Sequence, residues 1–161
     1  MTWLDNLQQL PPLARQTIPL AYRDINGHMN VQFYMELYDV AGWNLFDHWG
    51  VGKPYVALGQ FGMFALEQHI RYMAEVQIGQ SVALYGRLLG YDARFVHFIL
   101  YIVNETAGKL ASTLEEVAAH VDLQQRRTAV FSEAVIDRLT AELAAHTALT
   151  WPARSRGCLR V

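Results

Sequence analysis

The chain has 161 residues, of which 52% are hydrophobic and 17% charged, and its formal net charge is −2 at pH 7. This length fits one domain, and the composition excludes a disordered protein. The charge disfavours a general nucleic-acid-binding protein, and no apolar run reaches the roughly 18–20 residues that a membrane-spanning helix requires. We therefore expect one soluble domain over residues 1–161, with a core at roughly 15–140 and a loosely held tail from Thr147.

The ends of the chain indicate the cellular compartment. Residues 1–16 have neither the basic region nor the apolar region of a secretory signal. The single cysteine, Cys158, has no second cysteine with which to form an internal disulfide. Both features are typical of a protein of the reducing cytoplasm, and we expect a cytoplasmic location.

The N-terminal third predicts a strand, a turn and a long helix. Residues 16–22 have the pattern of a short strand, and a polar turn that contains Gly27 follows at 23–29. From Asn30 onward, apolar residues recur at steps of three and four, as in an amphipathic helix. These residues are Tyr34, Leu37, Tyr38, Ala41, Leu45 and Trp49. We expect Asn30 to cap this helix and the glycines and proline of residues 50–54 to end it.

The rest of the chain predicts four long strands joined by short turns, at residues 62–72, 82–88, 95–103 and 109–123, and then a helix that Ser132 caps. This order indicates an α+β fold in which a twisted antiparallel sheet wraps around one long buried helix. The far face of such a sheet would still carry apolar residues, so we expect a homodimer or homotetramer to cover it.

The segment that bears most on chemistry is DINGHMN, from Asp24 to Asn30. It places a carboxylate in a loop before a helix whose first amides, at Asn30 and Val31, have no intrahelical partner and carry the positive end of the helix dipole. Gly27 permits a tight turn and close approach of a ligand. Such a site suits hydrolysis of an activated acyl group. From the spacing alone, the more frequent alternative is that Asp24, His28 and Asn30 are only loop and capping residues.

The pattern D-x-x-G-H-M-N-x-x-x-Y, which ends at Tyr34, resembles the signature of the 4-hydroxybenzoyl-CoA thioesterase-like branch of the hot-dog superfamily. Residues 70–72 and 79–82 resemble that family's strand pair, and residues 111–127 its closing strand. The resemblance implies an acyl-CoA thioesterase of the α+β hot-dog fold, with an antiparallel sheet wrapped around one central helix. Within this branch the sequence is most similar to thioesterases of carnitine breakdown, whose acyl group is the quaternary ammonium betainyl.

The resemblance also implies roles for the loop residues. Asp24 is the nucleophile or the general base for water, and the sequence leaves these two roles open. Gly27 and the amides of Asn30 and Val31 would polarise the thioester carbonyl, while His28 and Asn30 shape the loop. In one departure from the family, Tyr22 occupies the position where relatives often have an additional acid.

Residues outside the motif are candidates for binding the two ends of the substrate. For the acyl group these are Tyr34, Asp39, Trp43, Phe61 and Phe64. The aromatic ones are more often core residues, although an aromatic cage would suit the betainyl cation. For the CoA phosphates the candidates are Arg87, Arg94, Arg126 and Arg127. A solvated surface position is the more frequent alternative for any single arginine.

The predicted partner is an acyl-CoA substrate, and we expect no cofactor and no metal, because the histidines form no compact ligand motif. Two other functions remain open. A hot-dog dehydratase or hydratase would act on the acyl chain, and a non-catalytic binder would hold CoA esters without releasing thiol. The position of Asp24 directly before the helix favours hydrolysis.

Overall fold

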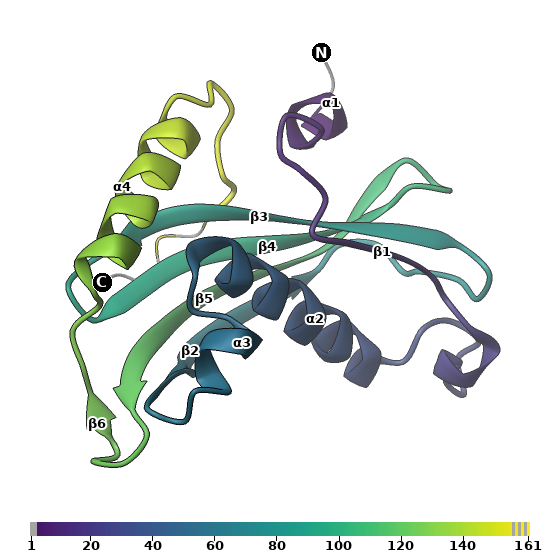
Figure 1. Cartoon of the computed structure of the whole chain (residues 1–161). Coiled ribbons are helices and arrows are strands. Elements are labelled where there is room, and N and C mark those ends of the chain that lie inside the picture. The colour runs from purple at the N-terminus through teal and green to yellow at the C-terminus, as the bar shows by residue number, and fades with distance from the viewer. Residues whose placement is uncertain (1–2, 156, 158, 160) are drawn as a thin grey trace. The chain divides into compact units, whose positions relative to one another are not determined.

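The computed structural model describes residues 3–155, 157, 159 and 161, so Cys158 lies outside the described residues. Its sheet has six strands in the order β1-β3-β4-β5-β2, with β6 paired to β5 (Figure 1). The elements are α1 (Trp3–Leu7), β1 (Ala14–Thr17), a 3-10 turn (Leu20–Tyr22), α2 (Val31–Trp49), α3 (Lys53–Val56), β2 (Phe61–Tyr72), β3 (Ser81–Tyr91), β4 (Phe95–Asn104), β5 (Lys109–Asp122), β6 (Arg127–Thr128) and α4 (Glu133–Thr147).

The long helix and the four long strands confirm the predicted α+β order. Strand β1 differs from the prediction, because it ends at Thr17 and a 3-10 turn replaces its second half. Pro19 explains the difference, since proline has no N–H to donate to a neighbouring strand. The short elements α1, α3 and β6 were not predicted, because segments of two to five residues are too short to show a hydrophobic period. Within the described residues, no helix is both long and apolar enough to cross a membrane.

The chain forms two compact units, to both of which α2 and strands β2 to β5 contribute. The first unit comprises Met1–Gly42, Ile70–Gly86 and Leu100–Leu114, and the second comprises Trp43–His69, Arg87–Ile99 and Glu115–Val161. The predicted single domain over residues 1–161 stays a prediction.

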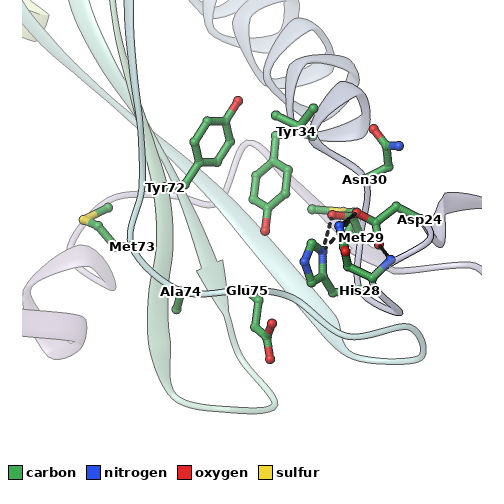
Figure 2. Close-up of a pocket in the computed structure, with 11 residues that line it drawn as sticks. Asp24, His28, Met29, Asn30, Tyr34, Tyr72, Met73, Ala74 and Glu75 are labelled. Atoms are coloured by element: carbon green, nitrogen blue, oxygen red, sulfur yellow. Dashed lines mark hydrogen bonds and ion pairs between the residues drawn. The ribbon is translucent and has the colours of Figure 1, made fainter.

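In the first unit, α2 packs on the sheet. Its buried residues Leu37, Tyr38 and Ala41 recur at helical spacing, as the amphipathic pattern predicts. The backbone approaches the sheet closely at Gly42, where a β-carbon would be 4.0 Å from Cδ1 of Leu100. This packing places the first turn of α2 beside the end of β2 (Figure 2).

In the second unit, aromatic side chains fill the core. The rings of Phe46 and Trp49 on α2 contact Phe98 on β4 at centroid distances of 5.6 and 5.8 Å. On α4, Val135, Leu139 and His146 are buried, as the helical spacing of α4 requires. The core of this unit therefore combines the second half of α2, the sheet and α4.

Candidate active site

The loop before α2 is closed on itself by backbone hydrogen bonds. Arg23 and Met29 form an antiparallel bridge, in which the N–H of Asp24 donates to the carbonyl of His28 at 2.9 Å. Gly27 turns the chain with φ of 90°, a left-handed conformation that residues with a β-carbon rarely adopt. These constraints fix Asp24 in front of the helix.

Both oxygens of the Asp24 carboxylate accept hydrogen bonds from Asn26. Its Oδ1 accepts from the backbone N–H of Asn26 at 2.8 Å, and its Oδ2 accepts from the Asn26 amide at 3.2 Å. Burial raises the pKa of Asp24, but the hydrogen bonds from Asn26 and the nearby His28 outweigh this effect, so the pKa lies below its ordinary value. The side chain is 13% exposed and is an anion at neutral pH.

His28 borders the same carboxylate. Its Nδ1 lies 3.1 Å from the carbonyl oxygen of Met29 and 3.6 Å from Oδ2 of Asp24. Because a carbonyl oxygen only accepts, Nδ1 carries the hydrogen and donates it. In this tautomer the other ring nitrogen, Nε2, carries the lone pair, and the shaping role of His28 stays a prediction.

The start of α2 confirms Asn30 as the N-cap, since its Oδ1 accepts from the N–H of Gln32 at 3.0 Å. The backbone N–H of Asn30 donates to the carbonyl of Tyr22 at 2.8 Å. The expectation that this amide polarises a substrate carbonyl is therefore wrong. The N–H of Val31, the first residue of the helix, has no intrahelical partner and carries the positive end of the dipole.

A cavity of about 520 Å³ lies in front of this helix start (Figure 2). The residues that line it are Asp24, Asn26, His28, Met29, Asn30, Val31, Tyr34, Tyr72, Met73, Ala74 and Glu75. The structure thus brings together five of the predicted residues, with Gly27 in the turn between them. The segment from Tyr72 to Glu75 was missed, although Tyr72 ends a strand that the sequence predicts.

The other predicted acyl-binding residues do not line this cavity. Asp39 is exposed on α2. Trp43 and Phe61 belong to the second unit, where Trp43 contacts Phe46 and Phe61 contacts the ring of His120 at 4.9 Å. Phe64, in the same unit, lies under the guanidinium of Arg126 at 5.2 Å. Their role in substrate binding stays a prediction.

Arg87 has a structural position. It is buried, donates to the carbonyls of Trp151 and His146 at 2.8 Å each, and stacks on the Trp151 ring at 4.6 Å. Because its guanidinium already donates to two backbone carbonyls, it is not available to bind phosphate. The prediction that Arg87 binds CoA is therefore corrected. The same contacts anchor the segment after α4 at Trp151.

Two of the remaining arginines share a second cavity of about 370 Å³. Arg94 and Arg127 line it together with Asp122, Gln125, Thr128 and Ala129. Both arginines are exposed, whereas Arg126 covers Phe64. Arg94 and Arg127 are therefore the better candidates for phosphate binding.

Comparison with known proteins identifies the family. The model of the thioesterase-like superfamily matches residues 18–139. The betainyl-CoA thioesterase of Pseudomonas aeruginosa is 31% identical over 131 residues, which cover 80% of this chain and 81% of that protein. An L-carnitine dehydrogenase/betainyl-CoA thioesterase of Agrobacterium fabrum is 34% identical over 122 residues, or 74% of this chain, which spans 25% of that longer protein.

Solved structures agree on the fold. A hypothetical protein of Staphylococcus aureus in complex with CoA has a TM-score of 0.81 at 22% identity, with 94% of this chain and 96% of that chain covered. A putative thioesterase of Pseudomonas putida has a TM-score of 0.78 at 24% identity, with coverages of 94% and 97%. The fold, the matched family and the position of the motif lead to one conclusion: the chain belongs to the thioesterase-like superfamily and is an acyl-CoA thioesterase of the hot-dog fold.

Proposed function

We propose that the protein hydrolyses betainyl-CoA to betaine and CoA, with Asp24 as the reacting carboxylate. The observation that carries this proposal is the position of an ionised Asp24 in a cavity at the N-terminus of α2. The similarity to the Pseudomonas aeruginosa betainyl-CoA thioesterase over most of both chains supports the choice of acyl group. The names of the relatives favour hydrolysis over hydration of the acyl chain and over binding without turnover.

In the proposed reaction the thioester carbonyl lies between Asp24 and the start of α2. The N–H of Val31 donates to the carbonyl oxygen and stabilises the negative charge that develops there. The carboxylate then either attacks the carbonyl carbon, forming an anhydride that water cleaves, or removes a proton from an attacking water. Both routes expel CoA thiolate, which takes up a proton, and both require Asp24 to be ionised.

The CoA phosphates bind elsewhere in this proposal. The described residues that line the Asp24 cavity include two carboxylates, Asp24 and Glu75, and no lysine or arginine, so the cavity would repel a phosphate. Arg94 and Arg127 carry guanidinium groups suited to phosphate and line a cavity of their own.

We also propose a homodimer or homotetramer. Strand β2 is an edge of the sheet and is 12 residues long. It exposes Phe64, Leu66 and Tyr72. A long edge strand with exposed apolar side chains favours association with a second copy, which would cover it. Light scattering coupled to size exclusion would give the mass in solution, and a monomer would refute this proposal. The cytoplasmic location stays a prediction.

The test of the proposed function is release of free thiol, followed with a thiol-reactive dye, from betainyl-CoA and from short and aromatic acyl-CoAs. We expect Asp24→Asn to retain the fold and to lose at least about a hundredfold in kcat, because the amide can neither attack nor act as a base. Asp137→Asn is the matched control, since Asp137 is exposed on α4. An Asp24→Asn variant as active as the control would refute the role of Asp24.

A further inference from the structure

We propose that Tyr34 and Tyr72, with the carboxylate of Glu75, form a subsite that receives a quaternary ammonium group on the acyl chain and selects for it. This inference rests on the proposed hydrolysis of a betainyl thioester and identifies the side chains that recognise the cation. All three residues line the cavity that contains Asp24.

The two aromatic rings form a corner. Tyr34 comes from the first turn of α2 and Tyr72 from the end of β2, and their rings stand at 86° with centroids 5.1 Å apart (Figure 2). In this edge-to-face pair the edge of one ring lies against the face of the other, and the half-exposed ring of Tyr72 offers a ligand a face that carries the negative part of the ring quadrupole. Cations bind such faces within about 6 Å of the centroid. Tyr34 is 5% exposed and Tyr72 is 49% exposed, so one wall is fixed and the other is open to a ligand.

The charge of the lining favours a cation. Asp24 and Glu75 are its carboxylates, and no lysine or arginine occurs among the described residues that line the cavity. Glu75 is held in place by a hydrogen bond from the side-chain amide of Gln77 at 2.9 Å. Burial raises the pKa of the hydroxyls of Tyr34 and Tyr72, so both remain neutral phenols at neutral pH. The lining therefore attracts a cation through the aromatic pair, chiefly the exposed Tyr72, and through a carboxylate.

The covalent structure of the acyl group places its cation in this cavity. In a betainyl group one methylene separates the quaternary nitrogen from the thioester carbonyl, so the nitrogen lies about 2.5 Å from the reacting carbon. A carbonyl beside Asp24 and Val31 therefore brings the cation against the lining of the same cavity. Trp43, Phe61 and Phe64 belong to the second unit and do not line it, which makes Tyr34 and Tyr72 the better candidates for the cage.

The experiment compares betainyl-CoA with tert-butylacetyl-CoA, in which a quaternary carbon replaces the quaternary nitrogen. The two acyl groups have nearly the same shape and differ in charge. We expect the wild-type enzyme to prefer the cationic substrate in kcat/KM by about tenfold or more. The readout is the change of this ratio between the wild type and a variant, because the higher intrinsic reactivity of the betainyl thioester and a general loss of activity or of folded protein cancel in that comparison.

Tyr72→Leu should reduce this ratio by about tenfold, whereas Tyr72→Phe, which keeps the ring, should retain most of it. Glu75→Gln changes an exposed residue and should reduce the ratio severalfold, and less so at high salt. It also tests the subsite if Tyr72→Leu fails to fold. Equal turnover of both substrates by the wild type, or a ratio unchanged in Tyr72→Leu and Glu75→Gln, would overturn the subsite and leave the thioesterase intact. Absence of turnover of every thioester would instead refute the proposed function, and with it this inference.

Discussion

The backbone N–H of Asn30 donates to the carbonyl of Tyr22 at 2.8 Å. This bond joins the two ends of the loop that carries Asp24, so the loop is closed at the point where α2 begins. It also uses the amide of Asn30 within the protein and leaves the N–H of Val31 as the first that helix geometry directs outward. The loop closure thereby determines which backbone group can polarise the substrate.

Gly27 should be required for activity as well as for stability. Its φ of 90° strains any residue with a β-carbon, although a β-carbon would contact nothing closer than 3.6 Å. Gly27→Ala should lower the free energy of unfolding by about 1 kcal/mol and reduce kcat/KM for an acyl-CoA, because relief of the strain moves Asp24.

Gly59 provides the matched control, since it has φ of 80° and open space around it. Gly59→Ala should lose similar stability in urea denaturation and keep its activity. If both variants lose the same fraction of activity, the effect of Gly27→Ala is one of general stability and not of the loop.

The pH dependence of activity should follow Asp24. Its pKa lies below the ordinary value of 3.8, so the carboxylate stays ionised as the pH falls from 8 to about 5. We expect kcat/KM to be constant over this range and to decrease only when the pH approaches the lowered pKa. Circular dichroism at each pH would separate loss of ionisation from acid unfolding. A decrease centred between pH 6 and 7 would contradict this prediction and indicate a histidine.

The features that the sequence predicted correctly are local ones. The apolar face of α2 and its N-cap at Asn30 follow from residues within a few positions of one another. The role of Arg87 depends on partners 59 and 64 positions away, and no local pattern indicates that its guanidinium is buried. Tyr72 and Glu75 were missed for the same reason, because only the pairing of strands brings the end of β2 beside α2.

Arg87 should contribute to stability and not to CoA binding. Arg87→Ala leaves the buried carbonyls of His146 and Trp151 without their donors and removes the stack on the Trp151 ring. We expect a loss of about 2–4 kcal/mol in the free energy of unfolding, with KM for acyl-CoA little changed in the folded fraction.

For the exposed Arg94 we expect the opposite result, an effect on KM and not on stability. Arg94→Ala should keep the free energy of unfolding within about 0.5 kcal/mol and raise KM if Arg94 binds a CoA phosphate. A raised KM with unchanged stability in Arg87→Ala would restore Arg87 to the phosphate-binding set.

His120 should make the protein less stable in mild acid. Its Nδ1 lies 3.0 Å from the carbonyl oxygen of Ala129 and therefore donates, while its Nε2 accepts from the hydroxyl of Tyr55 at 2.9 Å. This arrangement holds the imidazole neutral, and burial lowers its pKa below the ordinary value of 6.5. Because the folded pKa is the lower one, the stabilisation is complete above pH 6.5 and is lost as the pH falls through the folded pKa, by about 1.4 kcal/mol for each unit of pKa difference.

Nuclear magnetic resonance titration of the His120 ring should thus give a pKa below 6.5, and Tyr55→Phe should raise it, since that variant removes the hydrogen bond that favours the neutral ring. Urea denaturation from pH 7.5 to 5 would measure the consequence for stability. The wild type should lose stability over this range more steeply than His120→Phe, whose ring has no proton to bind. Parallel slopes for the two proteins would show that His120 binds the same number of protons in the folded and unfolded states, which would contradict the lowered pKa.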